Sequence, residues 1–459
     1  MARTNDRRLL VDALGRRLDR RRLLQATGAA GLAVGAGARL AAGTRAQDQD
    51  IAFSRDHEGT SLNILMEDLL ETTIIEGMLP EFEELTGITV NFEKVAYDVM
   101  HEKLVPQLAA GPGNGSYDVL EVDFYWVYEF ARSGWVEPLD DRIASSGGAI
   151  DLARYVPATL DIVSKADGQS WYVPFYAYPM GLIYRDDLLN DAAFKEEFAA
   201  ATGSELAIPD SVDGYVDLAT AITAWKGEEL YGAAMTAQQV DPIVMEFCNF
   251  LYGLGGDYYD ADLTAPTIND ATGLRAAQLY VDCVTKAAQP GAASANYNDS
   301  IALYSQGRAF SAVSYMWMLA IVDSDEAAAA RGKNKATVMP GGTGLSGAWG
   351  WGLPVSSPNP DAGWEFMRWV ESPDVARRRA LAGSLPTQIA PYDDPEILAK
   401  YPWLPQAQGM ITAGKGLPAV TKQAQLVEIV GRHLAEAVAG AASVQEAMDA
   451  AASELVELL

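Results

Sequence analysis

The chain has 459 residues, of which 49% are hydrophobic and 21% are charged, and its formal net charge is −28. This length is too great for one hydrophobic core and fits two domains, while the composition is that of an ordinary globular protein. The negative charge disfavours binding to nucleic acid or anionic membranes, and no run of eighteen or more strongly apolar residues predicts a transmembrane helix.

The first 46 residues differ from the rest of the chain in charge and residue size. Their arginines far outnumber their acids, and an Ala- and Gly-rich stretch follows at 26–42. A cationic segment, a weakly apolar segment and a small-residue zone are typical of an export signal. The run from Arg20 to Gln25, RRRLLQ, resembles the twin-arginine export motif. We therefore expect residues 1–46 to be an export signal of a soluble periplasmic protein; the alternative is a basic arm that binds nucleic acid.

Strands and helices alternate in the next part of the chain. Short apolar runs predict strands at 62–66, 88–92 and 117–122, and apolar residues at helical spacing predict helices at 71–85, 97–110 and 124–132. Such alternation predicts a mainly parallel sheet with helices on both faces. Ligands gather at the carboxyl ends of the strands of such sheets, which here are Met66–Asp68 and Asp123–Trp126.

The second half of the chain continues this pattern after one long crossing segment. The aromatic stretch at 171–186 contains prolines that resist helix, and it predicts a crossing strand. Further helices are expected at 210–225, 242–254, 274–288, 300–307 and 360–370, and a strand at 309–315. From residue 374 onward the chain is expected to be largely helical.

No metal site, histidine-based triad or cofactor is predicted. His57, His101 and His433 are scattered, and the two cysteines have no zinc-binding spacing. Cys248 and Cys283 lie in apolar, helical stretches. In an oxidising compartment they either pair or remain two buried thiols.

Three segments, taken in order, carry a resemblance to a known family. They are Tyr117–Asp141 (YDVLEVD, then GWVEPLDD), Val173–Leu188 (VPF, then GLIYRDDL) and Trp349–Phe366 (WGWGLP, then DAGWEF). Together, behind an export signal, they resemble the family 1 extracellular solute-binding proteins of ABC transporters, in the maltose-binding-protein-like carbohydrate uptake group. The resemblance covers roughly residues 60–459.

The resemblance implies a periplasmic-binding-protein fold of the α/β class. Two α/β lobes with mainly parallel sheets would be joined by several hinge crossings, with a ligand cleft between them. Lobe 1 is expected at 60–176 plus about 350–385, and lobe 2 at 177–349 plus about 386–459. The crossings are expected at Phe175–Gly181, Ser346–Pro354 and Ala382–Gln388. A ligand that contacts both lobes would draw them closed.

The family also implies a role and partners. The protein would be a monomeric binding subunit, not an enzyme, that captures a sugar, oligosaccharide or polyol and delivers it to the permease subunits of an ABC importer.

Sugars present flat C–H faces and a rim of hydroxyls, which match aromatic rings and carboxylates or amides. Candidate ligand-binding residues follow from their positions at strand ends, at the expected hinge and in polar or glycine-rich loops: Glu67, Asp68, Asp123, Trp126, Tyr176, Tyr178, Gln238, Asp241, Trp317, Trp349 and Trp351. The last three tryptophans either contact ligand or pack in the core. Asp123 is alternatively a helix N-cap, and Glu67 and Asp68 alternatively favour a helix start.

Two other functions remain open. The same fold could bind a polyamine or another non-sugar solute, because Glu67, Asp68 and Asp123 could hold a cation beside aromatic rings. An exported glycoside-acting enzyme would need two opposed carboxylates, which an acidic chain does not exclude. No Gly-x-Ser-x-Gly nucleophile motif is present in the sequence.

Overall fold

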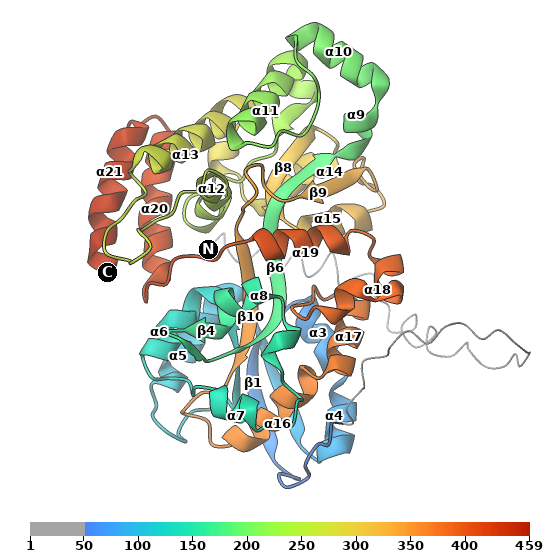
Figure 1. Cartoon of the computed structure of the whole chain (residues 1–459), viewed down its shortest axis with the longest axis vertical. Helices are drawn as coiled ribbons and strands as arrows, with labels where there is room; N and C mark the ends of the chain where they lie inside the picture. Colours follow the sequence, from blue (N-terminus) through green and yellow to red (C-terminus); the bar gives the residue numbers. More distant parts are fainter. Residues whose placement is uncertain (1–50) are drawn as a thin grey trace, which may run out of the picture.

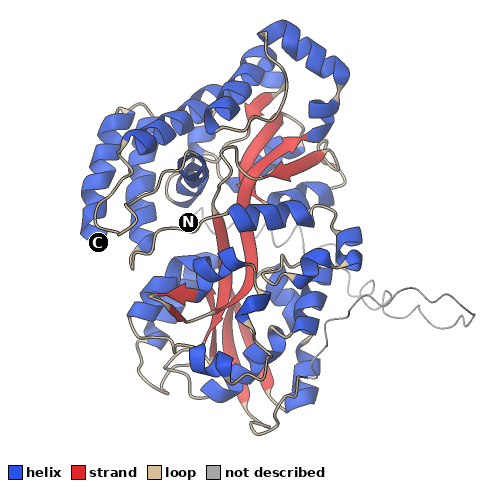
Figure 2. Cartoon of the chain, in the orientation of Figure 1, coloured by secondary structure: helices blue, strands red, loops and turns tan. Residues whose placement is uncertain are grey.

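The computed structural model describes residues 51–459, so the predicted export signal at 1–46 lies outside the described residues. Figure 1 shows an elongated molecule with two halves, and two long strands run between them. These strands are β6 (Val173–Arg185) and β10 (Ser346–Gly352). Helices cover both faces of the sheet in each half (Figure 2).

One half, called here the β1–β3 half, contains three parallel strands. They are β1 (Ser61–Glu67), β2 (Thr89–Val95) and β3 (Val119–Asp123), and β1 lies between the other two. The helices of this half are α3 (Leu70–Glu76), α4 (Leu79–Thr86), α5 (Tyr97–Leu108), α6 (Val127–Arg132), α7 (Asp140–Ala144), α16 (Pro360–Val370) and α17 (Pro373–Ala382). A small hairpin, β4 (Lys165–Ala166) and β5 (Gln169–Ser170), lies at its side.

The single helix predicted at 71–85 is wrong, because two helices occupy this stretch. Gly77 ends α3, and Pro80 lies in the first turn of α4. Proline has no N–H to donate to the preceding turn, so it favours the start of a new helix.

The other half, called here the β7–β9 half, contains β7 (Tyr231–Ala233), β8 (Ala309–Tyr315) and β9 (Asn334–Thr337). Its helices are α9 (Asp186–Asn190), α10 (Ala192–Thr202), α11 (Val212–Lys226), α12 (Asp241–Gly253), α13 (Ala271–Asp282), α14 (Tyr297–Ser305), α15 (Trp317–Ser324), α20 (Gln423–Val438) and α21 (Val444–Leu455). Helices α8 (Pro157–Thr159), α18 (Pro395–Lys400) and α19 (Leu404–Ala413) lie near the junction (Figure 1).

The strand order is β2-β1-β3-β10-β6-β8-β7, with β9 also paired to β6. Pairing is parallel at both ends of this sheet, whereas β6 and β10 run antiparallel to their neighbours. Residues 173–179 of β6 pair with β10, and residues 180–185 pair with β8 and β9. One continuous strand therefore joins the two halves, and the predicted α/β fold is confirmed.

The two cysteines are fully buried free thiols. Cys248 Sγ lies 3.0 Å from the Tyr258 hydroxyl, and Cys283 Sγ lies 3.8 Å from Met235 Sδ. The sequence leaves open whether these cysteines form a disulfide or remain buried thiols, and in the structure they are unpaired. None of the helices between residues 51 and 459 is both long and apolar enough to span a bilayer.

Candidate functional site

A continuous series of aromatic rings connects the two halves of the molecule. Neighbouring ring centroids in this series are 5.6–6.2 Å apart. The members, in spatial order, are Tyr97, Trp126, Trp349, Tyr176, Tyr178, Tyr315, Trp317 and Tyr297. We call them the aromatic series. Five of them are among the residues predicted from the sequence.

In the β1–β3 half, the rings largely cover one another. Trp126 stacks on Tyr97 with an interplanar angle of 14° and meets Trp349 edge to face. Trp349 in turn stacks on Tyr176 at 20°. Only 5% of Trp126 and 3% of Trp349 is exposed. These two tryptophans therefore pack mainly against the other rings of the series.

The strand register explains how these rings meet. Trp349 of β10 pairs with Asp123 of β3 on one side and with Tyr176 of β6 on the other. Residues directly opposite each other in an antiparallel pair project to the same face of the sheet. The carboxylate and the two rings are thus placed together by backbone pairing.

In the β7–β9 half, the series continues at the end of β8. Tyr315 is the last residue of β8, and Trp317 begins α15 and stacks on Tyr315 at 20°. Tyr297 meets Trp317 edge to face. Trp317 is half-buried, so part of its surface is accessible.

Buried carboxylates lie beside the series at the carboxyl ends of β1 and β3. Asp123 is 3% exposed and accepts a hydrogen bond of 2.5 Å from the Tyr178 hydroxyl. Although Asp123 precedes the 3-10 turn Phe124–Trp126, its side chain makes no capping hydrogen bond there. The helix-cap alternative for Asp123 is therefore wrong.

Glu121 adds unused hydrogen-bonding capacity to this region. Its Oε2 accepts from the backbone N–H of Glu67 at 2.6 Å, while its Oε1 has no partner among the described residues. The Tyr176 hydroxyl is likewise buried and without a partner in the described part of the chain. Burial raises the pKa of Glu121 well above its usual range, and the nearby carboxylates, first that of Glu67, raise it further. Buried polar groups of this kind require a proton, a water or a ligand to satisfy them.

Tyr125 links the two halves directly. Its hydroxyl lies 2.9 Å from Met245 Sδ and 3.4 Å from Asp241 Oδ1, and both residues belong to α12. Burial raises the pKa of Tyr125 well above its usual range, and Asp241 adds to this effect. The phenol therefore stays protonated and remains a donor at neutral pH.

The other predicted residues differ in burial. Asp68 and Gln238 are exposed. Trp351 is fully buried, stacks on Phe175 at 4.3 Å, and donates from Nε1 to Glu371 at 3.0 Å. Trp351 therefore belongs to the core of the β1–β3 half. Core packing is the alternative to ligand contact that the sequence left open for this residue.

Sequence reasoning missed several residues of the site, namely Tyr97, Glu121, Tyr125, Tyr297 and Tyr315. Two of them carried a usable signal. Tyr125 lies between the predicted Asp123 and Trp126, and Tyr315 ends the predicted strand before Trp317. The others depend on which strand and helix ends meet, so they could not be selected from the sequence.

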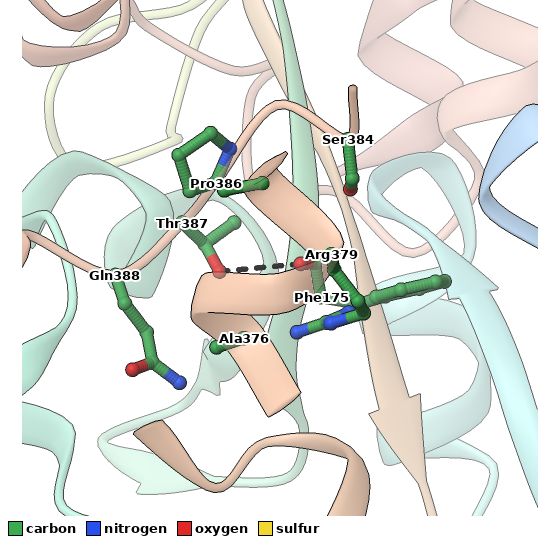
Figure 3. Close-up of a pocket in the computed structure, with 8 residues that line it drawn as sticks. Phe175, Ala376, Arg379, Ser384, Pro386, Thr387 and Gln388 are labelled. Carbon is green, nitrogen blue, oxygen red and sulfur yellow. Dashed lines mark hydrogen bonds between the residues drawn. The ribbon is translucent and has the colours of Figure 1, made fainter. Parts of the chain in front are cut away.

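A separate small cavity lies beside the crossing strands (Figure 3). Its volume is about 10 Å³, room for about one water molecule, and it is lined by Phe175, Ala376, Arg379, Ala380, Ser384, Pro386, Thr387 and Gln388. Arg379 pairs with the buried Glu371 at 2.6 Å, and its guanidinium lies 4.8 Å from the centre of the Phe175 ring. This buried pair joins α17 to the residue after α16, and the same Glu371 accepts a hydrogen bond from Trp351 of β10. Among residues 51–459, no cluster of His, Cys, Asp and Glu could hold a metal ion.

Comparison with known proteins finds a family and a fold. The family described as bacterial extracellular solute-binding protein matches residues 68–377. A probable amino-acid ABC transporter periplasmic-binding protein of Sinorhizobium fredii is 26% identical over 369 residues, which are 78% of this chain and 80% of that protein. The erythritol/L-threitol-binding protein of Mycolicibacterium smegmatis is 24% identical over 411 residues, 81% of each chain.

Two solved structures have the same fold. A solute-binding protein of Agrobacterium radiobacter in complex with ribitol superposes with a TM-score of 0.74 at 22% identity, covering 88% of this chain and 99% of that one. The sugar-binding protein MalE of Xanthomonas citri gives a TM-score of 0.74 at 21% identity, with coverage of 87% and 97%.

Proposed function

Because the chain belongs to the bacterial extracellular solute-binding protein family, whose members bind solutes and are not enzymes, we propose that it is the binding subunit of an ABC importer for a sugar or polyol. Its relatives include an erythritol/L-threitol-binding, a mannitol-binding, a maltotriose-binding and a lactose-binding protein. Solved structures of the same fold hold ribitol, mannitol and maltose.

The observation that carries this proposal is the aromatic series with its buried carboxylates. Aromatic faces pack against the C–H surface of a sugar or polyol, while carboxylates such as Asp123 accept hydrogen bonds from its hydroxyls. Both halves contribute, through Asp123 from one and Tyr315 and Trp317 from the other, and Tyr178 lies between them on the crossing strand β6. A ligand held there gains contacts only when the halves are together, so it favours closure.

The hinge and the lobes follow from the chain crossings. We place lobe 1 at 60–176 plus about 350–385 and lobe 2 at 177–349 plus about 386–459. β6 and β10 supply two crossings, and Pro386 bridges to Tyr176 at the third. Closure would then be a bend within paired strands, with small changes spread over several residues.

The cellular setting is proposed from the N-terminal segment and the family. Residues 1–46 would direct export through the twin-arginine pathway, and the remainder would act as a monomer outside the cytoplasm. The bound solute would then pass to the permease subunits of the importer.

A thermal-shift screen of the purified chain tests this function. The panel contains polyols, mono- and oligosaccharides, polyamines and amino acids. A ligand present at about 100 times its Kd should stabilise the protein by roughly 2.7 kcal/mol. A shift with a sugar or polyol supports the proposal. A shift with polyamines or amino acids alone would keep the importer role and reject the ligand class, and no shift with any compound would reject the site.

A further inference from the structure

We infer that the site takes a short polyhydroxylated ligand, a linear polyol or a single sugar ring, and that Tyr125 sets this length limit. The inference rests on the proposed function and narrows it. The structural neighbours include proteins that bind polyols and proteins that bind oligosaccharides. The inference assigns this protein to those that bind short ligands.

The first argument is the bridge that Tyr125 makes between the halves. Its hydroxyl is in contact with Met245 Sδ at 2.9 Å and reaches Asp241 Oδ1 at 3.4 Å. Asp241 and Met245 are four residues apart on α12, so they form one face of its first turns. Side chains in direct contact leave no passage for a sugar ring. The site is therefore closed where Tyr125, in the 3-10 turn Phe124–Trp126, meets α12.

The second argument is the number of accessible ring faces. A long oligosaccharide needs several successive aromatic platforms. Trp126 and Trp349, which could supply them, are 5% and 3% exposed and are covered by Tyr97, by Tyr176 and by each other. The half-buried rings at the junction, such as Tyr178 and Trp317, offer surface for a short ligand only.

The third argument is that the polar groups converge on one compact region. Asp123 and Tyr178 are hydrogen-bonded to each other, and the Tyr178 ring, on the crossing strand β6, lies 5.8 Å from that of Tyr315 on β8. The charges of Asp241 and Asp123 both act on the Tyr125 phenol. Groups from both halves thus surround a single small region instead of following an extended groove.

The unused groups lie at the inner end of this region. Glu121 Oε1 and the Tyr176 hydroxyl are buried without partners among the described residues. Glu121 lies two residues before Asp123 on β3 and accepts from the Glu67 backbone N–H at 2.6 Å, and Tyr176 pairs with Trp349, which also pairs with Asp123. A short chain of hydroxyls that reaches inward from the junction would satisfy them.

Calorimetric titration tests this inference on the purified chain and three variants. The ligands are linear polyols, monosaccharides, maltose and maltotriose. We expect the wild type to bind at least one polyol or monosaccharide about tenfold or more tightly than maltotriose, a difference of about 1.4 kcal/mol. Tyr125→Ala should open the closed end and reduce this ratio by about tenfold.

Two matched variants separate an effect on the length limit from a general loss of folded structure. Tyr125→Phe keeps the ring and should keep the ratio. Tyr128→Ala removes a half-buried ring that lies under Arg132 instead of in the series, and it should also keep the ratio. Thermal unfolding of each variant checks that it is folded.

The outcomes distinguish this inference from the proposed function. Tighter binding of maltotriose by the wild type overturns the length limit but keeps the sugar-binding function. An unchanged ratio in Tyr125→Ala overturns the role of Tyr125. Binding of polyamines or amino acids, with no sugar or polyol bound, overturns the proposed function and this inference together.

Discussion

The Tyr178 hydroxyl donates a 2.5 Å hydrogen bond to Oδ1 of Asp123, which ties the crossing strand β6 to the end of β3. Burial raises the pKa of Tyr178 well above its usual range, and the neighbouring Asp123 raises it further. The phenol therefore remains protonated and donates to the Asp123 carboxyl group. This bond fixes the carboxylate within the aromatic series.

Loss of this hydroxyl should weaken both the fold and the site. In Tyr178→Phe the ring contacts persist, but Asp123 loses a buried donor. We expect a fall of about 1–3 kcal/mol in the free energy of unfolding and at least about tenfold weaker ligand binding. Urea denaturation and calorimetry measure these changes. Tyr184→Phe, on the same strand but half-exposed, is the control, and equal effects of both variants would contradict the prediction.

Trp317 should contribute to ligand binding more than to stability. Trp317→Ala removes a half-buried ring that stacks on Tyr315, so we expect affinity to fall by about tenfold to a hundredfold. Trp171→Ala is the control, because Trp171 is also half-buried but bonds to Ala166 in the β4–β5 hairpin. If the two variants bind ligand equally well, Trp317 is a packing residue only.

Arg379 should be required for stability, in contrast to its neighbour Arg378. Arg379→Met leaves the fully buried Glu371 without its cation, which we expect to cost about 3–5 kcal/mol. Arg378 makes exposed ion pairs with Glu81 and Asp374, so Arg378→Met should cost at most about 1 kcal/mol. Chemical denaturation of both variants tests the contrast, and similar losses would contradict it.

Glu246 should make stability fall as pH rises. It is fully buried, and burial raises its pKa to about 8, although hydrogen bonds from Thr236 and Tyr280 oppose the shift. Between the ordinary pKa near 4.5 and about 8, the folded state keeps a proton that the unfolded state releases. The free energy of unfolding therefore decreases across this range, by at most about 1.4 kcal/mol per pH unit.

Glu246→Gln tests this because glutamine carries no charge at any pH. The variant should match the wild type near pH 4.5 and become progressively more stable than it toward pH 8, as measured by urea denaturation. Glu228→Gln, in an exposed turn, is the control and should show no such trend. A difference between wild type and Glu246→Gln that does not change with pH would contradict the prediction.

Much of the fold was predictable because its signals are local. The predicted strand at 309–315 and helix at 360–370 are found at those positions, and the strand predicted at 117–122 is found at 119–123, because each follows from apolar runs and spacing within a few residues. The break in the predicted helix at 71–85 was also local, since Pro80 marks it.

The site was only partly predictable because it depends on contacts between distant segments. Trp349 and Trp351 lie two residues apart on β10, so strand alternation alone treats them alike. Only the packing separates them, because Trp349 meets Trp126 and Tyr97 whereas Trp351 meets Phe366 of α16. The role of Tyr125 likewise depends on α12, which comes much later in the chain.

The position of β10 in the sheet also has a consequence for synthesis of the protein. β10 is the strand that joins β3 to β6, yet it is made long after both. Until it emerges from the ribosome, β3 and β6 each present an unpaired edge, and such edges can pair with other chains. Completion of this sheet requires closure of a long loop, which slows folding. A growing chain that stops before residue 346 should therefore be aggregation-prone. A chain that extends beyond residue 352 can pair β10 with β3 and β6 and so complete the sheet.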